Sequence, residues 1–248
     1  MRQLQLTSAA LVPHAPLLLE GVGPPDPERA GLREAAAALP MEGPVTVVLS
    51  AHGTRASVYL GADGSLDAHG LRGHDVAGEA APEMARRLAD AWGVPAIDAR
   101  LDHGAVVPMA LIGLRGPVVV ACLSEITGRH PAEARRAIEE GHAFAAALRE
   151  WDGPPVNFAA SAHSGAALAE RGPLGTRRGA LELEEHLRHA IENDPSRLGS
   201  LALDLSVEGG SCGSGVLSAV GDLVTGPGEI KAYGAPVGVG YLVASFPI

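Results

Sequence analysis

Short apolar runs alternate with longer amphipathic segments along most of this chain. The apolar runs are rich in β-branched residues and have the length of strands, and they occupy residues 4–12, 45–49, 57–60, 96–99, 118–123 and 156–159. Ala-rich segments with charged faces lie between most of them, at residues 27–38, 78–92, 131–151 and 180–193. This alternation predicts an α/β fold, with a mostly parallel mixed sheet covered by helices on both faces.

Two further strand-like runs close the chain, at residues 229–233 and 238–246, and the Gly-Ala-Pro sequence between them predicts a hairpin. We find no internal repeat and no low-complexity linker, so we expect residues 1–248 to form a single domain. In the helical segment 180–193 we expect the charged side chains at the surface, namely Glu182, Glu184, Glu185, His186 and His189.

The composition points to a soluble protein that acts on a small molecule in a pocket. The 248 residues are 46% hydrophobic, with a mean hydropathy of +0.14, which is enough to bury a sizeable core. The formal charge of -10 argues against nucleic acid or an anionic membrane as the main partner. The strongest apolar run, residues 117–123, is far shorter than the ~18 residues that a membrane span needs. With only two cysteines, Cys122 and Cys212, we expect a cytoplasmic protein without disulfides.

Two histidines lie where strands are predicted to end. His14 lies between Pro13 and Pro16, which stiffen the backbone after the first strand, and this suits a metal ligand. A loop histidine bonded to a neighbouring carbonyl is the alternative. His52 lies in the sequence Ser-Ala-His-Gly at the carboxyl end of a buried strand, which is where open α/β sheets place their sites.

Two more histidines follow the same rule. His103 precedes a predicted helix at 105–112, and the adjacent Asp102 would either cap that helix or orient a ligand. His163 follows the strand at 156–159. Four histidines at strand ends therefore predict one shared site at one edge of the sheet. Other histidines lie in polar loops or on a helix face and receive no role, namely His69, His74, His130 and His142.

Other kinds of site are poorly supported. The glycine-rich segment 209–215 lacks the lysine and the Ser/Thr of a phosphate-binding loop, and no Gly-x-Ser-x-Gly nucleophile motif is present. Histidines with a carboxylate and open coordination positions suit either a non-haem Fe(II) site or a hydrolytic zinc site. This ligand set alone does not decide between the two metals.

The histidine motifs, together with Ser-Cys-Gly at 211–213 and the closing segment 238–244, resemble the class III extradiol ring-cleavage dioxygenases. The order and spacing of the motifs match the LigB-type catalytic subunit, a fold that the Memo proteins share. The resemblance implies a single α/β domain, often oligomeric, with Fe(II) held by two histidines and a glutamate. It also implies an activity, the opening of a catechol-type aromatic ring with O2.

The resemblance assigns roles to the four histidines. His14 and His52 fall on the two histidine ligand positions of the family. His163 would be the acid–base residue that exchanges protons, and His103 would contact the oxygen of the substrate and shape the pocket.

The third ligand departs from the family pattern, because relatives read Glu-Cys-Gly where this chain has Ser211-Cys212-Gly213. Glu208 lies three residues earlier and would share a helix face with Ser211 and Cys212 if the segment is helical. We expect Glu208 as the Fe(II) ligand, whereas a Cys212 thiolate would favour copper or zinc. Memo proteins carry a metal-site cysteine at the position of Cys212, so the alternative function is a Memo-like metal-binding or regulatory protein.

Overall fold

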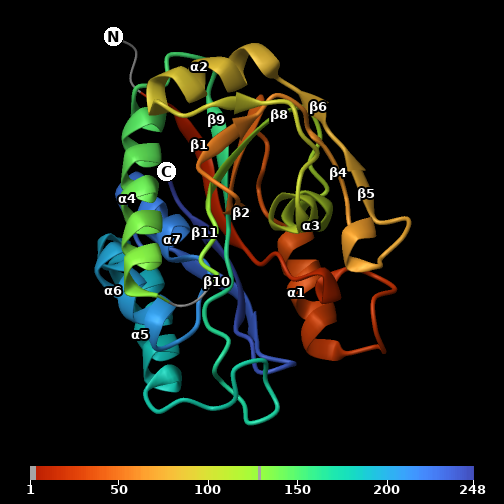
Figure 1. Ribbon diagram of the computed structural model, residues 1–248, viewed down its shortest axis with the longest axis vertical. Helices are drawn as coiled ribbons and strands as arrows, with labels where there is room; N and C mark the ends of the chain where they lie inside the picture. The colour runs from red at the N-terminus through yellow and green to blue at the C-terminus, as the bar shows by residue number, and fades with distance from the viewer. Residues whose placement is uncertain (1–3, 128–129) are drawn as a thin grey trace.

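The computed structural model describes residues 4–127 and 130–248 (Figure 1). Within them, nine strands form one sheet in the order β10-β11-β1-β9-β2-β8-β3-β7, and β6 pairs with β8. The central strands β1, β9, β2 and β8 run parallel, while β11 is antiparallel to both β1 and β10, and β3 is antiparallel to β8. The strands are β1 Leu6–Val12, β2 Val45–Gly53, β3 Ser57–Tyr59, β6 Glu79–Ala80, β7 Ala96–Ile97, β8 Pro117–Ser124, β9 Val156–Ser161, β10 Glu229–Gly234 and β11 Tyr241–Phe246. The predicted α/β class and the mostly parallel mixed sheet are confirmed.

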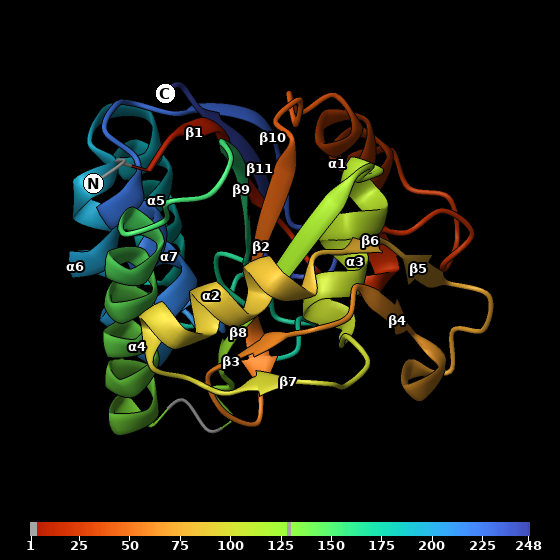
Figure 2. The ribbon, with the colours of Figure 1, turned by 90° about the horizontal axis from the view of Figure 1, so that it is seen from above.

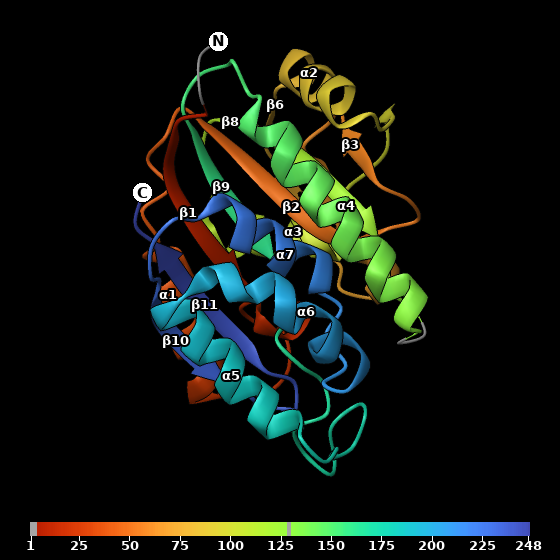
Figure 3. The same cartoon turned by 90° about the vertical axis from the view of Figure 1, so that its left-hand side faces the viewer.

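Helices cover the sheet on both faces, as Figures 1 and 2 show. The α-helices of the described chain are α1 Pro27–Ala37, α2 Pro82–Trp92, α3 His103–Ile112, α4 Pro131–Arg149, α5 Ala180–Asn193, α6 Leu198–Val207 and α7 Ser214–Leu223. The long helix α4 lies with α5, α6 and α7 on one face (Figure 3), and α1 and α3 lie on the other. None of these helices is both long enough and apolar enough to cross a membrane.

The core has two layers because strand residues alternate between the two faces of the sheet. In β1, Ala9 and Leu11 pack into the layer beneath α4 to α7, whereas Ala10 and Val12 pack into the layer beneath α1 and α3. Phe144 of α4 stacks on Phe158 of β9 with the ring centroids 6.0 Å apart, and both side chains are fully buried. Aromatic packing thus ties the longest helix to the middle of the sheet.

The sequence pattern did not reveal α6, α7 or the two-stranded sheet of β4 (Asp63–Ser65) and β5 (Asp75–Ala77). Helix α7 is buried at most of its positions, so it lacks the polar face that marks an amphipathic helix. The strands β4 and β5 are three residues each, too short for an alternating pattern to stand out.

Glu184 corrects the expectation that the acidic residues of α5 lie at the surface, since it is only 2% exposed. It belongs to the buried face of α5, with Ala180, Leu187 and Ile191 at helical spacing. Burial raises the pKa of the Glu184 carboxyl, and the nearby Ser164, Tyr233 and Arg188 oppose that rise.

The close contact between α4 and α7 gives a stability prediction. A Cβ atom added to Gly141 of α4 would lie 2.0 Å from the carbonyl oxygen of Gly215 in α7, and backbone cannot yield as a side chain can. We expect Gly141→Ala to lower the free energy of unfolding by ~1–3 kcal/mol, as overpacking does. The control is Gly31→Ala in α1, where an added Cβ meets nothing within 4 Å, and the better helix propensity of alanine should leave stability unchanged or raised by up to ~1 kcal/mol. Equal denaturation midpoints for the two variants would contradict this account.

Candidate metal centre

Three side chains from distant parts of the sequence meet at one edge of the sheet. The Nε2 atoms of His14 and His52 lie 3.0 Å apart, and the Cys212 Sγ lies 3.3 Å from the His14 Nε2. Among the described residues, these three form a group whose potential ligand atoms all lie within 4.8 Å of one another. Two nitrogens that share a metal at ~2.1 Å each cannot be more than ~4.2 Å apart, and this pair satisfies that limit.

The register of the parallel strands brings the histidines together. Leu11 of β1 and Leu49 of β2 both lie opposite Ala160 of β9. Each of these residues is followed three positions later by a histidine, namely His14, His52 and His163. The imidazoles consequently leave adjacent strands at the same level, at the carboxyl edge where open α/β sheets place their sites.

Cys212 reaches this edge from the other end of the chain, in the turn between α6 and α7. Ser211 is buried, and its hydroxyl donates to the carbonyl oxygen of His163 at 2.8 Å and accepts from the Gly213 amide at 3.0 Å. Ser211 therefore fixes the turn that presents Cys212. The adjacent Cys212 supplies the potential ligand atom, its Sγ.

Glu208 is not part of the cluster, and the condition that would bring it there, a helix across residues 208–212, is not met. Helix α6 ends at Val207 with Glu208 as its C-cap, and the Glu208 side chain is exposed. Gly209 and Gly210 follow, and Gly210 adopts a φ of +75°, a left-handed conformation that ends a helix. The one-face arrangement that would have kept the carboxylate near Cys212 does not form.

The hydrogen bonds around His14 place its proton on Nδ1 and leave Nε2 unprotonated, with a free lone pair. The Ser161 hydroxyl has a single proton and donates it to the carbonyl oxygen of Gly104. It must therefore accept from the Nδ1–H of His14, which lies 3.1 Å away. The unprotonated Nε2 then faces His52 and Cys212, as a metal ligand would.

Burial keeps the potential ligands neutral in the metal-free protein. Desolvation, helped by the neighbouring imidazoles, holds the pKa of His14 well below its usual range, and desolvation lowers the pKa of His52 to about 4. Burial raises the pKa of the Cys212 thiol to about 12. At neutral pH both imidazoles offer lone pairs, and Cys212 carries a proton that a metal would displace.

The other two predicted histidines join the same cluster. The rings of His163 and His103 lie with their centroids 5.6 and 5.7 Å from that of His14, and burial lowers both pKa values to about 4. The Nδ1 of His163 is buried and has no hydrogen-bond partner among the described residues.

His103 is held by the start of α3. The Asp102 carboxylate caps this helix, accepting from the Gly104 amide at 2.7 Å, which confirms the capping alternative. A Cβ added to Gly104 would lie 2.3 Å from the Ser50 Oγ and 2.8 Å from the His52 Cδ2. Glycine at this position therefore lets the first turn of α3 approach the His52 ring.

His69 is a fifth histidine at this site, although the sequence pattern gives it no role. Its ring lies with its centroid 4.6 Å from that of His103, although the side chain is exposed. The segment that carries it is bound to the start of α3 by the Leu101 amide, which donates to the Asp63 carbonyl at 2.9 Å. No local sequence signal marks His69, because only this tertiary contact brings it to the cluster.

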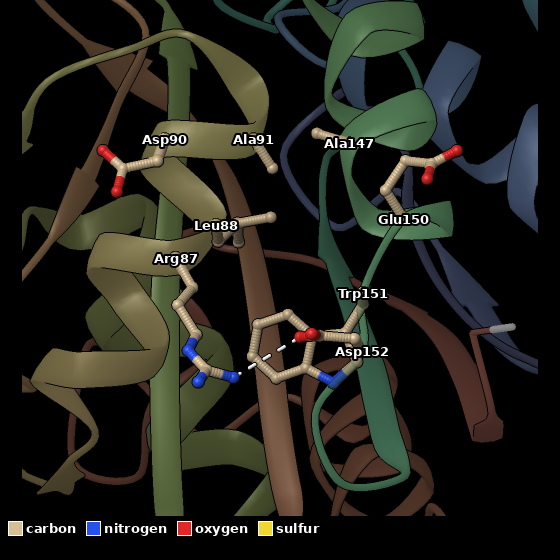
Figure 4. Close-up of a pocket in the computed structure, with 8 residues that line it drawn as sticks. All are labelled: Arg87, Leu88, Asp90, Ala91, Ala147, Glu150, Trp151 and Asp152. Atoms are coloured by element: carbon tan, nitrogen blue, oxygen red, sulfur yellow. Dashed lines mark hydrogen bonds and ion pairs between the residues drawn. The ribbon is translucent and has the colours of Figure 1, made fainter. Parts of the chain in front are cut away.

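A cavity of about 400 Å³ lies elsewhere, between α2 and α4 (Figure 4). Its lining includes Trp151 and the exposed ion pair of Arg87 with Asp152, whose atoms lie 3.4 Å apart. Trp151 and Asp152 precede the first residue of β9, whereas His163 follows its last, so the cavity is at the opposite edge of the sheet. It contains none of the potential metal ligands.

The fold and the convergent side chains thus define an α/β protein with a candidate His-His-Cys metal centre. No protein-family model matches the sequence, and the search of curated proteins gave no match. Among solved structures, the chain is similar to that of an uncharacterized protein, JW3007 from Escherichia coli K12, at 20% sequence identity and a TM-score of 0.63. The similarity covers 97% of this chain and 99% of that one, and it shows a common fold.

The neutral histidines predict a loss of stability in acid. The pKa values of His14, His52, His103 and His163 are depressed from 6.5, so between pH 6.5 and about 4 the unfolded chain binds more protons than the folded one. We expect the free energy of unfolding of the metal-free protein to decrease as the pH is lowered across this window, by up to about 1.4 kcal/mol per pH unit for each extra proton that the unfolded chain binds. Burial raises the pKa of Asp102 to about 6 and also raises that of Glu184, so these two carboxyl groups favour the folded state as the pH is lowered. Because four histidines act against two carboxyl groups, the net effect expected is a loss of stability in acid.

Denaturant unfolding at several pH values, with a chelator present, measures this dependence. His163→Gln removes one of the titrating groups and should make the dependence shallower than in the wild type. An unchanged slope in that variant would show that His163 does not titrate as its buried position implies.

Proposed function

We propose that this protein binds a transition-metal ion through His14, His52 and Cys212, and that its function depends on this ion. The observation that carries the proposal is the set of distances between the three potential ligand atoms, 3.0 Å between the histidine nitrogens and 3.3 Å from sulfur to nitrogen. The bare Nε2 of His14 supports it, because a buried lone pair that faces other potential ligands is suited to a cation.

The donor set favours a metal that accepts sulfur. Two imidazoles and a thiolate suit zinc or copper, and iron is also bound by such ligands, whereas the hard carboxylate of an Fe(II) oxygenase site is missing from the group. A metal bound here supplies Lewis-acid or redox chemistry. Of the two functions that the sequence leaves open, a Memo-like metal-binding or regulatory role therefore has the better support.

Metal affinity tests the ligand set. We expect the wild-type protein to bind one Zn(II) or Co(II) per chain, with Co(II) giving a thiolate charge-transfer band that Cys212→Ser abolishes. His14→Ala, His52→Ala and Cys212→Ser should each lose more affinity than the ~10–100-fold typical of residues that only support a ligand. Glu208→Ala is the matched control and should bind as the wild type does. If Glu208→Ala lost the metal and Cys212→Ser did not, the ligand set would be wrong.

Ring cleavage of a catechol-type substrate with O2 is the second candidate. The observation in its favour is the pair of neutral imidazoles beside the triad, since the buried Nδ1 of His163 has no hydrogen-bond partner among the described residues and its ring centroid lies 5.6 Å from that of His14. A neutral imidazole that holds no other partner can take a proton from a substrate hydroxyl and later return it. His103, 4.2 Å from His52 between ring centroids, would contact the substrate oxygen.

The ring-cleavage candidate has its own experiment. If it is correct, anaerobically prepared protein loaded with Fe(II) consumes O2 in the presence of some member of a catechol panel and forms a coloured product. His163→Ala should then lower turnover by ~10²–10⁴-fold with its metal content nearly intact, as expected for loss of a proton-transfer group. Absence of O2 uptake with every catechol, in protein that binds iron, would leave the metal-binding role alone.

A further inference from the structure

The Nδ1 atom of His52 points away from the metal triad and toward a carboxylate. The Glu125 Oε1 lies 3.3 Å from it, while the Nε2 on the opposite side of the ring faces His14. We propose that Glu125 is a positioning residue that holds the proton of His52 on Nδ1 and so leaves the Nε2 free to bind a metal. This inference rests on the metal-binding function proposed above.

The argument begins with the two places that the His52 proton can occupy. A neutral imidazole carries one proton, so protonation of Nε2 would direct an N–H at His14 and leave the Nδ1 lone pair against the Glu125 carboxylate. Protonation of Nδ1 instead gives a charge-assisted hydrogen bond to Glu125. The carboxylate therefore selects the form in which the Nε2 is bare, and without it the lone pair of His14 would compete for the same proton.

The backbone of Glu125 is fixed on two sides, which makes the contact a property of the fold. Its amide donates to the Gly53 carbonyl at 2.8 Å, extending the β2–β8 pairing by one residue. The preceding Ser124 is held by Glu140 of α4, which accepts from its amide at 2.7 Å and from its hydroxyl at 2.6 Å. The Glu125 side chain thus starts from a defined point beside the end of β2.

Solvent limits what this pair contributes to folding. The Glu125 side chain is 47% exposed, whereas that of His52 is 11% exposed, so water screens the attraction. The effect on the position of the proton rests on geometry, because the Nδ1 lies within hydrogen-bond distance of the carboxylate and the Nε2 faces His14 on the opposite side of the ring. Outer partners of this kind typically change metal affinity by ~10–100-fold.

The position of the proton can be read in the metal-free protein by long-range 1H–15N NMR of labelled histidine, with His52 assigned from the spectrum of His52→Gln. We expect the Nδ1–H form in the wild type and a shift toward the Nε2–H form in Glu125→Ala. Glu125→Gln should keep the Nδ1–H form, because its amide oxygen still accepts the hydrogen bond.

Metal titration of the same proteins with Zn(II) completes the test. Glu125→Ala should bind ~10–100-fold more weakly than the wild type, and Glu125→Gln should recover most of that loss. Glu139→Ala, which removes an equal charge from an exposed position on α4, should bind as the wild type does.

The possible failures are distinct. If Glu125→Ala keeps both the Nδ1–H form and the wild-type affinity, the inference is overturned and the metal site stands. If Glu125→Gln loses as much affinity as Glu125→Ala, the carboxylate acts as a ligand or through its charge, and the positioning role is also overturned. If neither the wild type nor the variants of His14, His52 and Cys212 bind Zn(II), the proposed function fails. The NMR result then still decides whether Glu125 determines which ring nitrogen of His52 carries the proton.

Discussion

The register of three parallel strands is the constraint on which the site depends. Because Leu11 and Leu49 both lie opposite Ala160, His52 at the end of β2 and the histidines just beyond β1 and β9 lie at the same level. Parallel pairing is fixed in turn by the two-layered core, since a slip of one residue would exchange the buried faces of every strand. The same packing that stabilises the sheet therefore sets the 3.0 Å separation between the His14 and His52 nitrogens.

Burial from water at this edge determines the chemical character of the cluster. Imidazoles that are buried together remain neutral, because each opposes the charge of the next and none is well solvated. Neutral nitrogens are ligands and proton acceptors rather than anion-binding groups. A metal would add the positive charge that the cluster lacks, and its binding would be coupled to loss of the Cys212 proton.

The turn between α6 and α7 decides which third donor is present. A glutamate in place of Ser211 would have to give up the two hydrogen bonds by which the serine holds His163 and Gly213. With serine there, the turn is tightened around its hydroxyl and the adjacent Cys212 comes within 3.3 Å of His14. Ser211 therefore supplies no carboxylate to the site, and its two hydrogen bonds hold the turn that presents the Cys212 thiol.

The sequence by itself determined the α/β class, most of the strands and the gathering of four histidines, because hydrophobic periodicity and strand-end position are local properties. The third donor was decided by tertiary structure. Glu208 and Cys212 are four residues apart, and the left-handed Gly210 between them turns one to solvent and the other to the site.

Glu125 and His69 likewise have no signature in the sequence, because their relation to the histidines arises from strand pairing and from a loop folded against α3. Such contacts join residues that are distant along the chain, and only the packed structure brings them together.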